Sequence, residues 1–196
     1  MRGFTDEEIE GQTRLARQVA GIDNQLQPDL MTVITAYKRA GSRPFNYQRC
    51  GYDDLPEAEA AWDASKSILM MRHDVFGRMN SNEPRARFTI SHELGHFWLK
   101  HSGIRNRSIT PSIAERLVSQ IRREEREAMR FAPAFLAPAH LIDPFASIEE
   151  IMETFLLSKE AATIRSQELQ RLYRRKNRIE RPLPASIEEF IRTTKW

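Results

Sequence analysis

A single cysteine, Cys50, occurs among the 196 residues of the chain. One thiol excludes an internal disulfide framework and a cysteine-rich zinc ribbon. We therefore expect a reducing, cytoplasmic setting for this protein. Any metal ion that it binds must take its ligands from histidine, glutamate and aspartate side chains.

Long hydrophobic runs are also absent. The longest apolar stretches, such as Ile68–Met71, are much shorter than the roughly 20 residues that span a bilayer. The N-terminal residues lack the apolar segment of a secretory signal. These absences predict a protein with neither a membrane span nor a leader peptide.

Charge of one sign is not in large excess either. The chain carries 30 Lys and Arg against 27 Asp and Glu, a formal net charge of +3, which is too small to indicate nucleic-acid binding. Basic residues do gather in one run, at 171–181. The run is either a contact with DNA or an acidic partner, or a solvated helix end that the helix dipole favours. We favour the second interpretation, and a base-stacking platform is unsupported because Tyr173 is the one aromatic residue in the run.

Hydrophobic residues make up 40% of the chain, which is enough to build a folded core. Capping patterns and helical spacing predict helices, and short apolar runs predict strands. We expect helices at about 5–20, 28–40, 85–101, 110–136, 147–156, 159–175 and 186–193, with Pro133 kinking or ending the fourth. We expect a strand at 66–72, a loop or a short helical turn at 76–84, and leave 43–50 ambiguous. The predicted fold class is α+β, rich in helix, with a small sheet before residue 85.

His92-Glu93-Leu94-Gly95-His96 forms an H-E-x-x-H sequence on a predicted helix, the signature of zinc metalloproteases. Positions i and i+4 lie about 40° apart on a helix, so both imidazoles face one way and can share a metal ion. Zinc suits this donor set and keeps a fourth position for water in catalytic sites. Glu93 lies about 100° round the helix from His92, where it can act as general base for that water.

A third ligand must come from elsewhere in the chain. The extended form H-E-x-x-H-x-x-G-x-x-H is excluded, because Leu99 and Ser102 stand at its glycine and last histidine positions. Three glutamates on the following predicted helix are candidates, namely Glu124, Glu125 and Glu127. Helical phase places the first two beside the apolar face of that helix and turns Glu127 toward solvent. Phase alone does not separate Glu124 from Glu125.

Two blocks of the sequence resemble the ImmA/IrrE family of metallopeptidases. The first block is Arg87–His96, and the second comprises Glu125–Ala128, Phe131, Ala132, Leu136 and Pro138. The strand predicted at 67–71 also stands where the family places one before the metal-binding helix. The resemblance is good over residues 66–140 and looser over 5–165.

The resemblance implies a zincin-like fold in which His92, His96 and Glu125 bind zinc and Glu93 is the catalytic base. Members of the family typically cleave or inactivate helix-turn-helix transcriptional repressors. We therefore expect a cytoplasmic zinc endopeptidase that acts on such a repressor or on an antitoxin-like partner. Its metallopeptidase domain is expected at 1–145, with a C-terminal helical extension at 146–196 packed on it.

One residue departs from the family pattern. Members commonly carry asparagine four residues after the metal-binding glutamate, where this chain has Met129. Either a hydrogen bond to a ligand is lost, which weakens metal affinity or activity, or another group supplies it. The histidines outside the motif are His73, His101 and His140. Helical phase turns His101 about 140° away from His96 and the site. We expect the other two to be ordinary surface or packing residues rather than oxyanion stabilisers.

Two alternatives to a protease stay open. The first is a zinc-bound regulatory module that docks on a transcription factor without cutting it, which Met129 and the basic run favour. The second is a DNA-binding protein whose H-E-x-x-H sequence is accidental. Such a protein would contain no metal, and its DNA affinity would fall with salt and with neutralisation of Arg174–Arg178.

Overall fold

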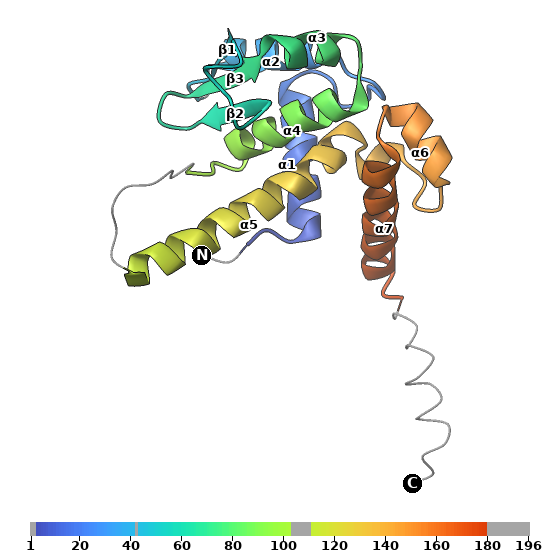
Figure 1. Cartoon of the computed structure of the whole chain (residues 1–196). Helices are drawn as coiled ribbons and strands as arrows, with labels where there is room; N and C mark the ends of the chain where they lie inside the picture. The colour runs from blue at the N-terminus through green and yellow to red at the C-terminus, as the bar shows by residue number, and fades with distance from the viewer. Residues whose placement is uncertain (1–2, 42, 103–110, 180–196) are drawn as a thin grey trace.

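The computed structural model describes residues 3–41, 43–102 and 111–179, without the side chains of 111–117. It combines several helices with one three-stranded sheet (Figure 1). This confirms the helix-rich α+β fold that the sequence predicts. The helix predicted at 186–193 and the predicted helix start at residue 110 lie outside the described residues. Within the described part of the chain, no helix is long and apolar enough to cross a membrane.

Two N-terminal helices begin and end where local sequence signals predict. Helix α1 is Asp6–Val19, and the Thr5 hydroxyl and the Glu8 carboxylate accept hydrogen bonds from each other's backbone N–H. This reciprocal arrangement satisfies donors that the first turn leaves unpaired. Helix α2 is Leu30–Ala40, with an aspartate as its N-cap. Gly21 has a φ of +69°, which lets the chain turn sharply after α1.

The sheet consists of β1 (Asn46–Cys50), β2 (Ala60–Asp63) and β3 (Ile68–Arg72). The strand order is β1-β3-β2, with β1 parallel and β2 antiparallel to the central strand. β3 confirms the strand predicted at 66–72, and β1 resolves the ambiguous segment at 43–50. Strand β2 was not predicted, because its sequence Ala-Ala-Trp-Asp contains no β-branched residue and ends in a residue type that is rare in strands.

Two helices follow the sheet. Helix α3 is His73–Asn80, so the first five residues of the segment 76–84 belong to an eight-residue helix, longer than the loop or short helical turn predicted there. Val75 and Met79 lie one turn apart and are buried, and this packing outweighs the loop-forming residues around them. Helix α4 is Pro84–Trp98, with the Glu83 carboxylate accepting a hydrogen bond from the backbone N–H of Ala86. The helix stops at Trp98, three residues before the predicted end.

The C-terminal half of the described chain is helical. Helix α5 (Pro111–Leu136) is followed by the short 3-10 helix η1 (Ala139–Leu141), α6 (Ile148–Phe155) and α7 (Lys159–Lys176). A kink or an early end was predicted at Pro133. Helix α5 does not end there but continues for three more residues, to Leu136. The N–H that Pro133 lacks is lost near the end of the helix, where few further bonds depend on it.

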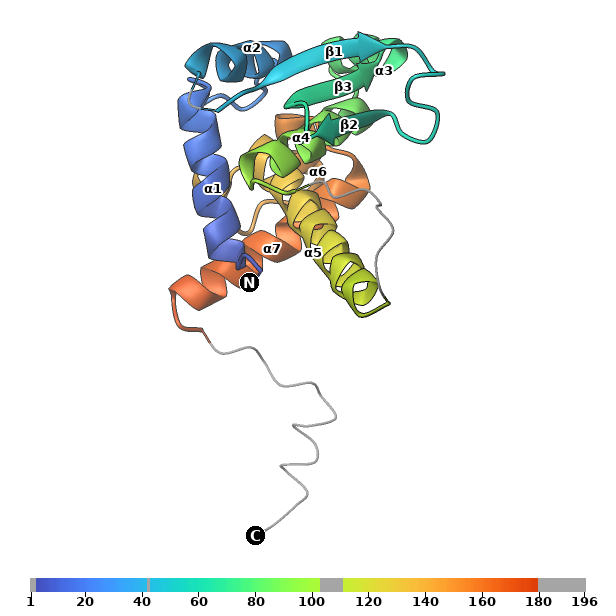
Figure 2. The ribbon, with the colours of Figure 1, turned by 90° about the vertical axis from the view of Figure 1, so that its left-hand side faces the viewer.

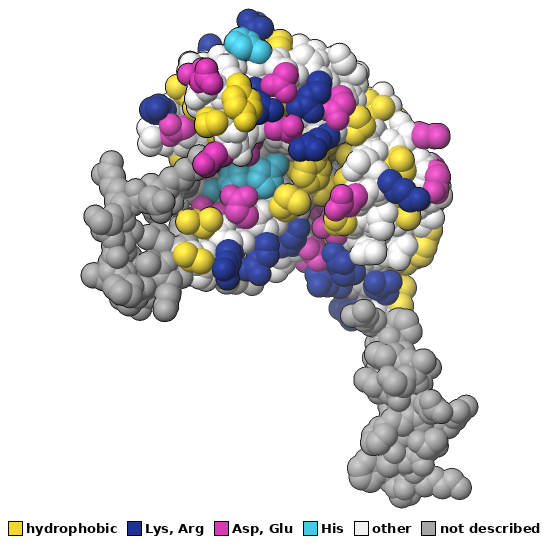
Figure 3. All heavy atoms as spheres, in the orientation of Figure 1, with side chains coloured by type: hydrophobic (Ala, Val, Ile, Leu, Met, Phe, Trp, Pro, Cys, Tyr) yellow, Lys and Arg dark blue, Asp and Glu magenta, His cyan; other side chains and the backbone are white. Residues whose placement is uncertain are grey.

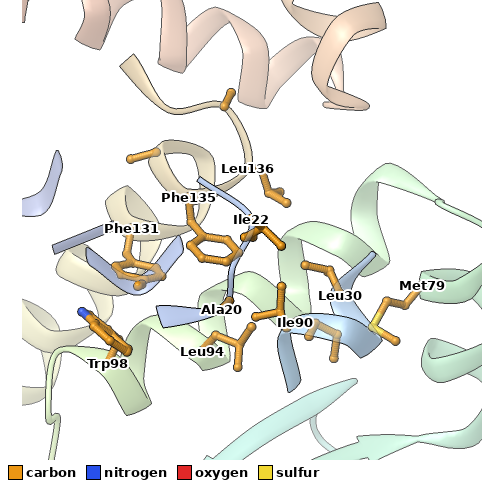
Figure 4. Close-up of a cluster of buried hydrophobic side chains, with 14 of the residues drawn as sticks. Ala20, Ile22, Leu30, Met79, Ile90, Leu94, Trp98, Phe131, Phe135 and Leu136 are labelled. Carbon is orange, nitrogen blue, oxygen red and sulfur yellow. The ribbon is translucent and has the colours of Figure 1, made fainter. Parts of the chain in front are cut away.

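The core lies between α4 and α5. Ile90 and Leu94 of α4 point toward Phe131 and Phe135 of α5, and all four side chains are buried (Figure 4). Fully burying such a side chain stabilises the fold by about 1.5–3 kcal/mol relative to leaving it exposed. The two helices approach closely at Gly95, where an added Cβ would lie 3.1 Å from the Phe131 ring. In both ribbon views α4 lies between the sheet and α5, so its residues can reach both (Figure 2).

Candidate metal centre

Helix α4 presents two imidazoles on one side. Its buried residues pack toward α5 and the sheet, which leaves His92 and His96 partly exposed and one turn apart. Their Nε2 atoms lie 3.1 Å from each other. Figure 3 shows histidine side chains gathered in the hollow between the sheet and α5, with acidic side chains beside them. The structure therefore brings the two histidines of the motif to a common point.

Glu125 reaches the same point from α5. Its Oε2 lies 3.3 Å from His92 Nε2, and its Oε1 lies 3.5 Å from His96 Nε2. The hydrogen bond from the His92 imidazole holds the pKa of the Glu125 carboxyl below its usual value, so the carboxyl is anionic near neutral pH. The Glu125 side chain is 55% exposed, so it contacts solvent as well as the two imidazoles.

These three donors fit a tetrahedral cation. Ligands that lie 2.0–2.1 Å from zinc at tetrahedral angles are about 3.3 Å from one another. The two Nε2 atoms are 3.1 Å apart, His92 Nε2 is 3.3 Å from Glu125 Oε2, and His96 Nε2 is 3.5 Å from Glu125 Oε1. All three separations are close to that spacing, with the two carboxylate contacts made by different oxygens. Two imidazole nitrogens and one carboxylate oxygen are also a donor set that zinc commonly takes in hydrolytic enzymes. The side chains present therefore fit the ion that the motif implies.

Glu93 lies beside this triangle. Its Oε1 is 4.0 Å from His92 Nε2, and potential ligand atoms of His92, Glu93 and His96 all lie within 4.8 Å of one another. Its Oε2 accepts a hydrogen bond of 2.7 Å from the backbone N–H of Trp62 in β2. The carboxylate is thus oriented by the edge strand of the sheet. Glu125 lies closer than Glu93 to His92 Nε2, at 3.3 Å against 4.0 Å, and it also contacts His96 Nε2, which favours it as the third ligand.

The other two candidate glutamates are buried away from the imidazole Nε2 atoms. Glu124 is 7% exposed and accepts hydrogen bonds from Gln120 (2.8 Å) and from Ser102. Glu127 is 5% exposed, so the prediction that it faces solvent was wrong. Helical phase misplaced it because the backbone just before α1 covers this side of α5, where the N–H of Phe4 donates to Glu127 Oε1 at 3.1 Å.

The prediction that His101 faces away from the site was also wrong. It assumed that α4 continues to residue 101, but the helix ends at Trp98 and Lys100 has a φ of +60°. This turn folds the chain back, and His101 Nδ1 lies 3.0 Å from His96 Nδ1. His101 Nε2 lies 3.1 Å from Glu127 Oε2. Burial lowers the pKa of the His101 imidazole, an effect that the Glu127 carboxylate partly opposes.

The remaining histidines and Met129 lie outside the group. His140 Nε2 is 3.0 Å from the backbone oxygen of Asp23, in the segment after α1, and His73 is exposed at the start of α3. Met129 is one turn after Glu125 on α5 and is exposed. Its thioether donates no hydrogen bond, so it does not replace the amide that the resemblance leads one to expect there.

The basic run is partly neutralised within the molecule. Arg175 Nη1 lies 3.2 Å from both Asp6 Oδ2 and Glu7 Oε1 at the start of α1, and Arg171 is 3.9 Å from Asp6. These pairs tie the end of α7 to the acidic first turn of α1. They support the interpretation of this run as a helix end rather than a contact with DNA. Arg174 and Lys176 lie on the same last turn of α7.

The comparisons with known proteins follow the same part of the chain. No curated protein matches it. The peptidase family Peptidase_M78, described as the IrrE N-terminal-like domain, matches residues 61–167, from β2 to the middle of α7. The match includes both α4 and α5. It also extends across residue 145, where the sequence predicts the end of the metallopeptidase domain, and that boundary stays a prediction. The chain therefore belongs to the IrrE N-terminal-like peptidase family, which is of the metallopeptidase type.

Proposed function

We propose that the protein is a zinc-dependent endopeptidase in which His92, His96 and Glu125 hold the metal ion and Glu93 is the general base. The observation that carries the proposal is the approach of the Glu125 carboxylate from α5 to both imidazole Nε2 atoms of α4. A pair of surface histidines on an amphipathic helix would have no reason to share a carboxylate from another helix. Membership of a peptidase family supports the same chemistry.

Each side chain has a distinct part in peptide hydrolysis. When bound, zinc supplies a Lewis acid that polarises the peptide carbonyl and lowers the pKa of water. Glu93 accepts a proton from the attacking water molecule and delivers it to the leaving amine. The N–H of Trp62 holds one oxygen of Glu93, which leaves Oε1 on the side of His92. This fixed orientation keeps the base beside the proposed metal ligands.

The proposed substrate is a protein, specifically a helix-turn-helix transcriptional regulator or an antitoxin-like partner. This part of the proposal depends on the resemblance of Arg87–His96 and the Glu125 block to the ImmA/IrrE family. The test is to incubate the zinc-loaded protein with the regulator encoded beside its gene and to follow fragments by mass spectrometry. Discrete cleavage at one site is the expected result. A regulator that stays intact with active, zinc-loaded protein contradicts the substrate assignment.

Replacing Glu125 by alanine should lower zinc affinity by at least about 100-fold, because removal of a ligand costs more than the 10–100-fold loss typical of its supporting partners. The measurement is a competition titration with a chromogenic chelator. Glu124→Gln is the matched control, since Glu124 is one residue away on α5 and bonds Gln120 and Ser102 instead of the imidazole Nε2 atoms. Equal losses in the two variants, or a larger loss in the control, would refute the choice of Glu125.

A second candidate function is a zinc-bound regulatory module that docks on a transcription factor without cutting it. Met129 favours this candidate, because it stands one turn after Glu125 and cannot support the ligand by a hydrogen bond. The two functions differ in one readout. A stable complex with the regulator and no fragments supports the module, whereas fragments support the peptidase.

A further inference from the structure

A continuous row of polar contacts lies behind His96. Glu127 Oε2 is 3.1 Å from His101 Nε2, and His101 Nδ1 is 3.0 Å from His96 Nδ1. The opposite nitrogen of His96, Nε2, is the atom that faces Glu125. Glu127 and His101 are each 5% exposed, so water competes little for these contacts.

Only one arrangement of protons satisfies this row when each ring is neutral. The Glu127 carboxylate can only accept, so His101 Nε2 carries a hydrogen and donates it. His101 Nδ1 then has a lone pair and accepts from His96, whose Nδ1 must carry the hydrogen. His96 Nε2 is left with a lone pair directed at the site. This is the tautomer in which an imidazole binds a metal ion through Nε2.

We propose that His101 and Glu127 are positioning residues that hold His96 in its metal-binding tautomer and orientation. The proposal rests on the proposed metal centre, which uses His96 as a ligand. A carboxylate behind a ligating histidine is a common support for metal sites. Here a second imidazole, that of His101, stands between the Glu127 carboxylate and the His96 ring.

The two ligand histidines differ in this support. Among the described residues, the Nδ1 of His92 is buried and has no hydrogen-bond partner. The structure therefore assigns the fixed ligand to His96 and leaves the ring of His92 without a comparable anchor. His96 would therefore be the fixed member of the ligand set, and His92 and Glu125 would supply the other two donors.

The backbone before α1 fixes the far end of the row. Phe4 N–H donates to Glu127 Oε1 at 3.1 Å, and Arg123 Nε is 3.9 Å from the same oxygen. A Cβ added at Gly3 would lie 2.9 Å from Glu127 Oε1, so a larger residue there would have to displace this carboxylate oxygen. Gly3 and Phe4 lie outside the family match at 61–167. Part of the support for the metal-binding region therefore comes from a segment that the match does not include.

The direct test is the tautomer of His96 in the metal-free wild-type protein at neutral pH. Long-range ¹H–¹⁵N NMR correlation spectra of the histidine rings identify which nitrogen carries the hydrogen. We expect Nδ1–H for His96, and a mixture of tautomers in His101→Leu. An Nε2–H tautomer in the wild-type protein overturns the proposal. This measurement needs no zinc, so it separates failure of the positioning role from failure of the proposed peptidase function.

The second test is zinc affinity by chelator competition. His101→Leu and Glu127→Gln should each weaken zinc binding by about 10–100-fold. His101→Asn should retain more affinity than His101→Leu, because its amide oxygen can accept from His96 Nδ1. Glu124→Gln is the control for loss of a buried α5 carboxylate and should change affinity little. Unchanged affinity in both His101→Leu and Glu127→Gln, with melting temperatures showing folded protein, overturns the proposal.

Discussion

Replacing Glu93 by glutamine is expected to slow peptide cleavage by about 10²–10⁴-fold while zinc binding is retained. Glutamine keeps the shape of the side chain and can still accept the hydrogen bond from the backbone N–H of Trp62. Its amide cannot take a proton from water near neutral pH, so the general base is lost. The bound ion depends on His92, His96 and Glu125, none of which is changed.

Three measurements on the Glu93→Gln variant decide this prediction: zinc content, cleavage rate and melting temperature. The wild-type protein and Glu124→Gln serve as controls, since Glu124 is a glutamate whose hydrogen bonds lie outside the proposed chemistry. If the variant cleaves the cognate substrate as fast as the wild type with equal zinc content, Glu93 is not the base. If zinc is lost together with activity, Glu93 is a ligand and the assignment of Glu125 must be revised.

Introducing valine at Gly95 is expected to destabilise the fold by about 1–3 kcal/mol and to weaken zinc binding at the same time. The first carbon of the new side chain would lie 3.1 Å from both Cβ and Cδ1 of Phe131. Phe131 cannot move aside easily, because it is fully buried and stacks on Phe135 with ring centroids 5.6 Å apart. Relief therefore comes from separation of α4 and α5, which carry the two histidines and Glu125.

The measurements for Gly95→Val are denaturant unfolding and chelator competition. Gly11→Ala is the matched control, because Gly11 is also inside a helix and an added Cβ there meets no atom within 4 Å. The control should gain up to about 1 kcal/mol from the better helix propensity of alanine. A Gly95→Val protein as stable as the wild type would show that α4 and α5 adjust at this contact without cost.

Helix α4 was predictable because its signals are local. The apolar spacing and the H-E-x-x-H sequence both lie within the helix and need no tertiary information. The same reasoning failed for β2, whose residues do not favour a strand and which is held by pairing with β3. Strand formation there depends on a neighbour that a local pattern does not reveal.

The choice among three glutamates shows the limit of helical phase. Phase reasoning holds that a carboxylate beside an apolar face is costly unless it is paired or binds metal. In the structure Glu124 and Glu127 are the buried carboxylates, and each is satisfied by hydrogen bonds. Glu125, which faces the imidazoles, is the most exposed of the three glutamates. The resemblance to a family pointed to Glu125, the carboxylate that lies beside both imidazoles, whereas burial would have pointed to Glu124 or Glu127.

His101 was missed for a related reason. Its position was counted along a continued helix, but a left-handed residue at Lys100 reverses the chain. Nothing in the sequence marks Lys100 as left-handed, because lysine rarely adopts positive φ. The H-E-x-x-H motif followed by a histidine five residues later is the signal that could have drawn attention to it.

The unequal exposure of the three donors governs how a cation would enter and leave. The imidazoles of His92 and His96 are 14% and 12% exposed, whereas the Glu125 side chain is 55% exposed. An ion held there would have the more buried imidazoles on one side and the exposed Glu125 carboxylate on the other, so rotation of this one side chain would open its path. Release of the ion would then require its bonds to the ligands to break and one side chain to move, without unfolding of α4 or α5. A chelator in solution would therefore reach the site in the folded protein.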